Sequence, residues 1–151
     1  MAKKATAQDA KLVMQLYDLR REAEMRKARS WFNGEFWPAN ADEFLKVANQ
    51  FPSQHNNWIR QVSGYWDMAA SFVVRGALNE ELFLEPGCSG EMFFSFAKVY
   101  PFLKELREKM GNPMMYANIE RVATGTKAAR NQLNRFVTLV ETRRKAMAKS
   151  A

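Results

Sequence analysis

A single histidine and a single cysteine limit the catalytic arrangements that this chain can hold. A Ser-His-Asp or Cys-His arrangement would have to use His55, which lies in a polar segment typical of the first turn of a helix. A structural zinc site needs four ligands of the Cys or His type, and His55 and Cys88 supply only two. Paired Glu-x-x-His motifs and glycine-rich phosphate loops are absent. We therefore predict no catalytic residue, no metal and no cofactor.

Four acidic residues are the remaining candidates for chemistry, namely Asp67, Glu80, Glu81 and Glu91. They could converge where a central helix, an acidic turn and an aromatic helix meet, and burial among aromatic rings would raise a carboxyl pKa. In the structural alternative, the two adjacent glutamates stabilise a helix N-terminus and Asp67 pairs with an arginine. The arginines within reach in the sequence are Arg60, Arg75 and Arg107. We favour the structural alternative and expect that the protein is not an enzyme. Catalysis by the acidic cluster is therefore ranked third, after the two binding hypotheses given below.

Basic residues are concentrated at the two ends of the chain. The net charge is +7, and residues 111–151 alone contribute +6, whereas residues 38–110 are net acidic. Such an excess suits nucleic acid, an anionic membrane surface or an acidic protein. The candidates for contact with nucleic acid or an acidic partner are Arg20, Lys27, Lys127, Arg130, Arg135, Arg143, Arg144 and Lys145.

The nucleic-acid hypothesis requires the basic residues of both ends to share one surface. Arg20 and Lys27 are seven residues apart and face the same way on a helix, and Lys127 and Arg130 are three apart. No helix-turn-helix, zinc finger or aromatic single-strand platform accompanies them, so binding would be weakly sequence-selective. The alternative for the first helix is a solvated face that is supported by its own charge pairs.

Three aromatic residues close the first predicted helix and form a candidate interaction patch. These are Trp31, Phe36 and Trp37. A helix end has fewer neighbours to cover such side chains, and an exposed aromatic patch would suit self-association. Our first hypothesis is therefore a non-enzymatic protein-interaction or self-associating module, with a homodimer as one form, and nucleic-acid binding is the alternative.

The elements that must position these residues are all helical. The central one is expected to be capped by Ser53 and to end near Gly76. From Trp58 onward apolar residues recur along it at steps of three and four, as on the buried face of a bundle helix. That face comprises Trp58, Val62, Tyr65, Trp66, Ala69, Phe72 and Val73. The pattern predicts an all-α fold, a compact bundle of four to six helices with two long basic terminal helices and a proline-kinked helix.

Caps and breakers give the expected bounds. The first helix starts after Thr6 or Asp9 and ends before Pro38, and the last runs from Pro113 to about Ala148. The other predictions are two short helices opened by Asn40 and Asn79, a loop over residues 85–90, and a helix that is kinked at Pro101 and ends at Gly111.

Five segments of the middle of the chain resemble a bacterial family of small helical proteins of unknown function. They are Tyr65–Ala70, Gly76–Phe83, Gly90–Phe94, Pro101–Glu108 and Gly111–Pro113, and the resemblance covers roughly residues 58–123. It implies an all-α fold and no reaction. Many members of that family carry a membrane-spanning segment, and this sequence shows none.

The chain is expected to form one domain over residues 1–151, with residues 1–8 and 146–151 frayed. The longest apolar run, Met68 to Val74, is far shorter than the roughly 20 residues of a membrane span, and no secretory signal is visible. One cysteine suits a reducing compartment. We therefore expect a cytoplasmic protein.

Overall fold

A computed structural model describes residues 3–151, which form nine α-helices and one 3-10 helix and contain no strand. The all-α prediction is confirmed. The helices outnumber the four to six that we predicted, because three of the expected helices, the first, the proline-kinked one and the last, are each divided in two. They are α1 (Ala7–Arg20), α2 (Ala23–Gly34), α3 (Ala41–Ala48), α4 (Gln54–Val74), α5 (Glu80–Phe83), α6 (Pro86–Ala97), α7 (Leu103–Met110), α8 (Ala117–Gly125) and α9 (Lys127–Ser150), with the 3-10 helix η1 at Tyr100–Phe102.

The chain turns after α1, so the single helix predicted up to Trp37 is wrong. The Glu22 carboxylate accepts hydrogen bonds from the backbone N–H groups of Glu24 at 3.0 Å and Met25 at 2.9 Å. These bonds satisfy donors at the start of α2 that have no partner within the helix. Glu22 thus serves as the N-cap of a new helix.

The loop predicted over residues 85–90 is also wrong, because α6 begins there. Pro86 occupies the first helical position, where its fixed φ suits the helix and its missing N–H costs no hydrogen bond. The kink predicted at Pro101 is instead a break, with the proline inside the short 3-10 helix between α6 and α7. Helix α7 ends at Gly111 as predicted, with φ at 61°.

The last predicted helix is divided as well. Tyr116 has a left-handed backbone with φ at 59°, and α8 begins only after it. Thr126 then ends α8 and caps α9, because its Oγ1 accepts a hydrogen bond from the N–H of Ala129 at 3.1 Å. We predicted fraying over residues 146–151, but α9 continues through this segment to Ser150. Of the N-terminal segment that we predicted to fray, residues 1–2 lie outside the described residues.

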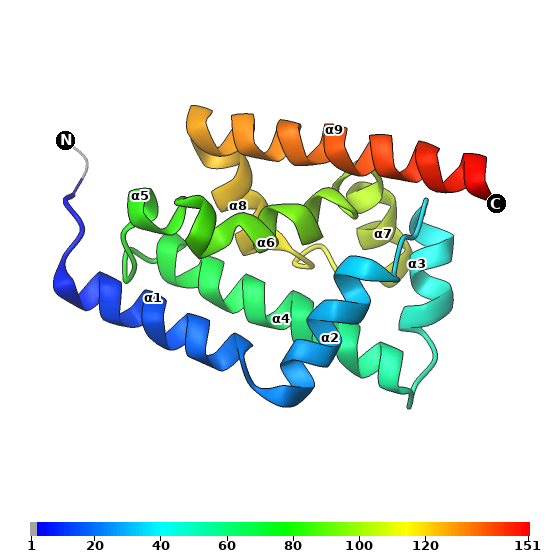
Figure 1. Ribbon diagram of the computed structural model, residues 1–151, viewed down its shortest axis with the longest axis horizontal. Helices are drawn as coiled ribbons and strands as arrows, with labels where there is room; N and C mark the ends of the chain where they lie inside the picture. The colour runs from blue at the N-terminus through cyan, green and yellow to red at the C-terminus, as the bar shows by residue number, and fades with distance from the viewer. Residues whose placement is uncertain (1–2) are drawn as a thin grey trace.

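The core is built around α4, as the central stripe predicted. Helix α4 packs against α2 on one side and α8 on the other, while α6 lies between α4 and α9 (Figure 1). Trp66 is 1% exposed, and Val62 and Ala69 are buried beside it. Figure 1 shows α9 along one long edge and α1 along the opposite edge. No helix among residues 3–151 is long and apolar enough to cross a membrane.

Candidate functional site

Helix α9 presents the most strongly charged surface of the described chain. Its 24 residues hold seven Lys or Arg and a single acid, Glu141. Ala129, Leu133 and Val140 are buried against the domain, which leaves the opposite face to solvent. The exposed polar residues of that face are Lys127, Arg130, Asn131, Asn134, Arg135, Thr138, Glu141, Thr142, Lys145 and Lys149. We call this set the α9 outer face.

The spacing of the cations aligns them along the helix. Lys127 and Lys145 are 18 residues apart, which is five full turns at 3.6 residues per turn, so both project from the same side. At 1.5 Å per residue they are about 27 Å apart. Arg130 is partly held, since its Nη1 donates to the carbonyl oxygen of Thr124 at 2.8 Å. Asparagine and threonine side chains lie between the cations and can donate hydrogen bonds.

One of the predicted basic residues of α9, Arg144, faces inward instead. The guanidinium of Arg144 donates to the carbonyl oxygens of Pro38 at 2.5 Å and Lys98 at 2.7 Å, and burial lowers its pKa. Arg143 remains exposed, with its guanidinium 5.5 Å from the centroid of the Phe94 ring. Arg144 therefore joins α9 to the rest of the domain, and its assignment to a binding surface is corrected.

The basic residues of the N-terminal helices do not share the α9 surface. Arg20 is buried, with its guanidinium over the Trp66 ring at 5.1 Å and its Nη1 donating to the carbonyl oxygen of Cys88 at 3.5 Å. Lys27 is exposed and forms an ion pair with Glu24 at 3.0 Å. Helix α1 lies on the edge opposite α9, and α2 begins near the end of α1 and crosses α4 (Figure 1). The single basic surface that the nucleic-acid hypothesis required is thus not formed.

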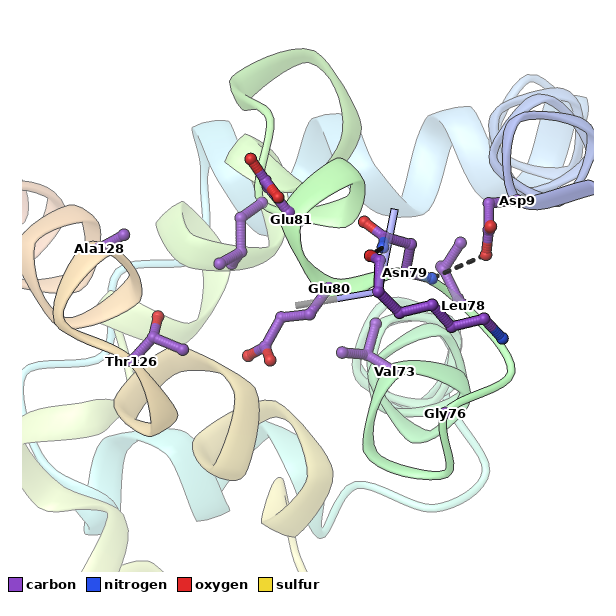
Figure 2. A pocket seen from close by; sticks show the side chains of 11 residues that line it. Asp9, Val73, Gly76, Leu78, Asn79, Glu80, Glu81, Thr126 and Ala128 are labelled. Atoms are coloured by element: carbon purple, nitrogen blue, oxygen red, sulfur yellow. Dashed lines mark hydrogen bonds between the residues drawn. The ribbon is translucent and has the colours of Figure 1, made fainter. Parts of the chain in front are cut away.

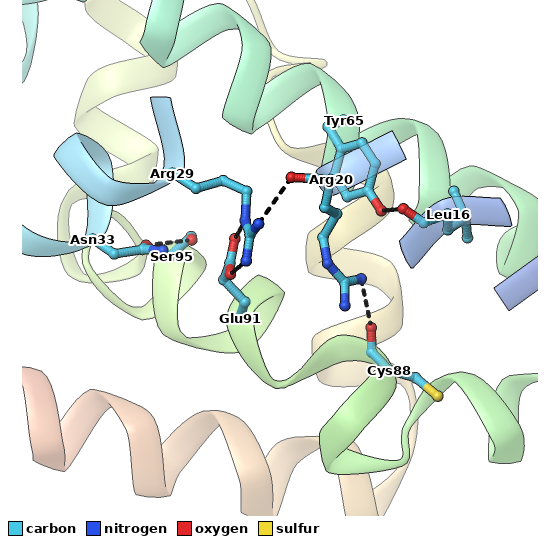
Figure 3. A network of polar contacts seen from close by, with 8 residues as sticks. All are labelled: Leu16, Arg20, Arg29, Asn33, Tyr65, Cys88, Glu91 and Ser95. Atoms are coloured by element: carbon cyan, nitrogen blue, oxygen red, sulfur yellow. Dashed lines mark hydrogen bonds and ion pairs between the residues drawn. The ribbon is translucent and has the colours of Figure 1, made fainter. Parts of the chain in front are cut away.

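The four acidic candidates are engaged in separate places. The Asp67 carboxylate accepts hydrogen bonds from the N–H groups of Asn118 at 3.1 Å and Ile119 at 3.2 Å, so it caps α8 and pairs with none of the arginines considered. Glu91 forms an ion pair with Arg29 at 2.6 Å (Figure 3). No group of three His, Cys, Asp or Glu residues that could hold a metal ion occurs within residues 3–151.

Glu80 and Glu81 line a cavity of about 430 Å³ between α5, the end of α4 and the start of α9. Figure 2 shows the Glu80 side chain extending from α5 toward the α8–α9 junction. Asn79 caps α5 as predicted, with its side-chain oxygen accepting from the N–H of Leu82 at 2.8 Å. Asp9 also borders the cavity and accepts a hydrogen bond from the Asn79 N–H at 2.8 Å. Asp67 and Glu91 lie outside this lining.

The predicted aromatic patch is not exposed. Trp31 and Phe36 are 8% and 6% exposed, and their rings stack on each other with centroids 4.8 Å apart. His55, from the first turn of α4, also stacks on the Trp31 ring, with centroids 4.6 Å apart. Trp37 is half-buried, and its Nε1 donates to the carbonyl oxygen of Gly34 at 3.1 Å. The patch prediction is wrong because α4 covers the end of α2.

One buried cation escaped the sequence analysis. Lys98 is 0% exposed, its Nζ donates to the carbonyl oxygen of Phe32, and it lies 4.1 Å from the centroid of the Trp37 ring. Burial, together with the charges of Arg144 and Arg143, lowers the pKa of Lys98 to about 7. The available signal was that Lys98 is the one charged residue between Phe93 and Tyr100, a stretch in which the remaining residues except Ser95 are apolar or aromatic.

Taken together, the described residues define an all-α domain with one long helix at its edge that carries most of the excess positive charge. The chain belongs to the family described as Domain of unknown function (DUF4760), whose model matches residues 5–126. The predicted family resemblance is confirmed and extends to α1–α3. The matched segment ends where α9 begins. No curated protein and no solved structure gives a significant match to the chain.

Proposed function

We propose that this protein is a non-enzymatic binding module that holds nucleic acid by its phosphate backbone on the α9 outer face alone. This interface is narrower than the shared surface of both chain ends that the sequence hypothesis required, which is not formed. The observation that carries the proposal is the charge of the α9 outer face, which holds Lys127, Arg130, Arg135, Lys145 and Lys149 and a single acid, Glu141. Because cations that line one face can neutralise several phosphates at once, such a helix supplies sequence-independent affinity. The family model ends at residue 126, so the proposal concerns this chain and not the family.

The composition of the α9 outer face favours nucleic acid over an acidic protein. The centre of a protein interface is usually apolar and aromatic, with charged residues depleted. Here Asn131, Asn134 and Thr138 lie between the cations, and all three are exposed. Asparagine and threonine side chains are common donors to phosphate oxygens, whereas they provide little apolar anchoring. The same face offers no stacking platform, so the expected binding is weakly selective for sequence.

The positions of the acidic residues support a non-enzymatic role. Asp67 is committed to the N-terminus of α8, and Glu91 is committed to Arg29. A general acid or base must be within hydrogen-bond reach of a substrate. Neither carboxylate borders the cavity that Glu80 and Glu81 line. The self-associating module of our first hypothesis has lost its predicted surface, because Trp31 and Phe36 are buried.

The test is a titration of labelled random-sequence duplex DNA and RNA, followed by fluorescence anisotropy at two salt concentrations. With four phosphates neutralised, the affinity should fall about a hundredfold between about 50 mM and about 200 mM salt. The variant Lys127→Gln/Lys145→Gln removes two cations from the α9 outer face and should lower the salt slope by about two. No binding at the lower salt concentration would exclude this function.

A matched control separates α9 from net charge alone. The variant Arg26→Gln/Lys27→Gln removes the same charge from the first half of α2, where both side chains are exposed and neither belongs to the α9 outer face. It should bind like the wild type if α9 is the interface. Equal losses in the two variants would mean that overall charge, and not α9, attracts the nucleic acid, and the proposal would then be wrong.

A further inference from the structure

Helix α1 carries apolar residues on its solvent side as well as on its core side. Leu16 is buried, whereas Met14 is 66% and Tyr17 is 47% exposed. A surface helix usually confines its apolar residues to the one stripe that faces the core. Ala10, one turn before Met14, is exposed on the same side. We call Ala10, Lys11, Met14, Tyr17 and Asp18 the α1 outer face.

We propose that the α1 outer face pairs with the same face of a second copy of this chain, with the two α1 helices antiparallel about a two-fold axis. Closed two-fold pairing is the commonest form of self-association, and each patch must then complement itself. The geometry that supports this is the placement of two opposite charges. Lys11 and Asp18 are both exposed, and neither has an ion-pair or side-chain hydrogen-bond partner within residues 3–151.

The two charges are placed for reciprocal contact. They are seven residues apart, which is about two turns, so they project from the same side of α1. A two-fold axis midway between them passes beside Met14. It brings Lys11 of one protomer opposite Asp18 of its partner, and the same contact occurs a second time by symmetry. The pairing therefore covers the exposed apolar residue at its centre and neutralises both charges at its edges.

The local side chains permit a close approach of the helices. Ala7 and Ala10 are small and exposed on the outward side of the first half of α1. Packed helices need interaxial distances of 8–10 Å, and small side chains favour the shorter values. At 14 residues, α1 is about 21 Å long, so the interface is small and belongs to the weak, concentration-dependent class.

This interface is independent of nucleic-acid binding. Figure 1 shows that α1 and α9 lie along opposite long edges of the domain. Pairing through α1 therefore leaves the α9 outer face of both copies open. Loss of self-association would not disturb phosphate binding by a single copy, and the failure of one proposal can be distinguished from the failure of the other.

The first test is sedimentation equilibrium of the full chain from about 1 µM to about 1 mM, the range of weak complexes. The wild type should change from monomer to dimer over this range. Met14→Glu should weaken the dimer at least about tenfold, because it buries a charge at the centre of the interface. Met114→Glu is the matched control, since Met114 is 69% exposed but lies between α7 and α8. It should dimerise like the wild type.

A charge exchange tests the antiparallel geometry directly. In a homodimer of the Lys11→Glu variant, two acidic side chains would face each other at each cross-contact, and in a homodimer of the Asp18→Lys variant, two lysines would. Each variant alone should therefore stay monomeric. Mixed in equal amounts they should form a heterodimer, because both cross-contacts are then of opposite charge. Each change suits the helix dipole, with an acid toward the N-terminus and a cation toward the C-terminus, and should leave α1 folded.

Three outcomes would overturn the proposal. The wild type could remain monomeric at the highest concentration, Met14→Glu could dimerise as well as Met114→Glu, or the mixed charge variants could stay monomeric. The third outcome, with a dimeric wild type, would place the dimer contact away from the antiparallel α1 pair. Circular dichroism of each variant verifies that its helices are retained.

Discussion

The guanidinium of Arg29 and the carboxylate of Glu91 form a two-point ion pair that joins α2 to α6. Nε donates to Oε1 at 2.7 Å and Nη2 donates to Oε2 at 2.6 Å, and the pair is half-buried. The remaining nitrogen, Nη1, donates to the carbonyl oxygen of Arg20 at 3.0 Å, which is the last residue of α1 (Figure 3). The Arg29 side chain thus joins the consecutive helices α1 and α2 to α6, which comes about 60 residues later in the chain. The hydrogen bond to Glu91 raises the pKa of Arg29.

Glu91→Gln should lower the free energy of unfolding by about 1 to 3 kcal/mol, because a half-buried guanidinium loses its charged partner. Urea denaturation measures the change. Glu108→Gln is the control, since Glu108 is exposed on α7, and a change there should cost less than about 0.5 kcal/mol. Equal stability of the Glu91→Gln variant and the wild type would show that solvent replaces the lost partner.

Asp67 stabilises α8 from outside that helix, so the loss of stability should depend on which residue replaces it. Tyr116, in the cap position, contributes no side-chain hydrogen bond, so Asp67 supplies the acceptor from α4. Asp67→Asn keeps an oxygen acceptor and loses the charge, whereas Asp67→Ala loses both. Asp67→Ala should cost about 1 to 2 kcal/mol in urea denaturation, and Asp67→Asn should cost less. The reverse order would exclude capping as the role of this carboxylate.

Local sequence signals were sufficient to predict a helix boundary where the capping residue is one of the types that commonly cap helices. Thr6, Asn40, Ser53 and Asn79 all cap helices, because short polar side chains reach the backbone N–H groups two or three residues ahead. The end of α7 at Gly111 was equally clear, since glycine adopts a left-handed backbone without steric cost. The central apolar stripe likewise placed α4 in the core.

Other boundaries depend on contacts that sequence spacing does not show. Glu22 is an unusual cap, so the division between α1 and α2 carried no standard signal. A glycine inside a helix costs only about 1 kcal/mol relative to alanine, so the presence of Gly125 did not by itself predict that α8 ends there and α9 begins after Thr126. The role of Asp67 depends on packing between α4 and a helix about 50 residues later. Burial of Trp31 similarly follows from the position of α4, which no local pattern specifies.

Lys98 should make the stability of the protein depend on pH. Its pKa is about 7 in the folded chain and ordinarily about 10.5, so the unfolded chain binds the additional proton between these values. Stability must then rise with pH across this window, and the cost of burying the charge is fully present below pH 7. From pH 7 to pH 9 the contribution of this group should rise by about 2 kcal/mol.

The measurement is urea denaturation of the wild type and Lys98→Met at both pH values. The difference between the two proteins isolates Lys98 from the other titrating groups, and it should shift in favour of the wild type as the pH rises. Lys104→Met is the control, because Lys104 is exposed on α7. A difference that is independent of pH would show that Lys98 keeps its proton in the folded chain.

Two glycines should respond oppositely to the same substitution. At Gly111 the backbone φ is 61°, a conformation that costs an alanine about 1 kcal/mol, although an added Cβ would meet no atom within 4 Å. At Gly64, inside α4, an added Cβ also meets no atom within 4 Å, and the backbone is helical. Gly64→Ala should therefore raise the free energy of unfolding by about 0.5 to 1 kcal/mol, because alanine loses less backbone entropy on folding. Urea midpoints that move in the same direction for both variants would contradict the left-handed assignment at Gly111.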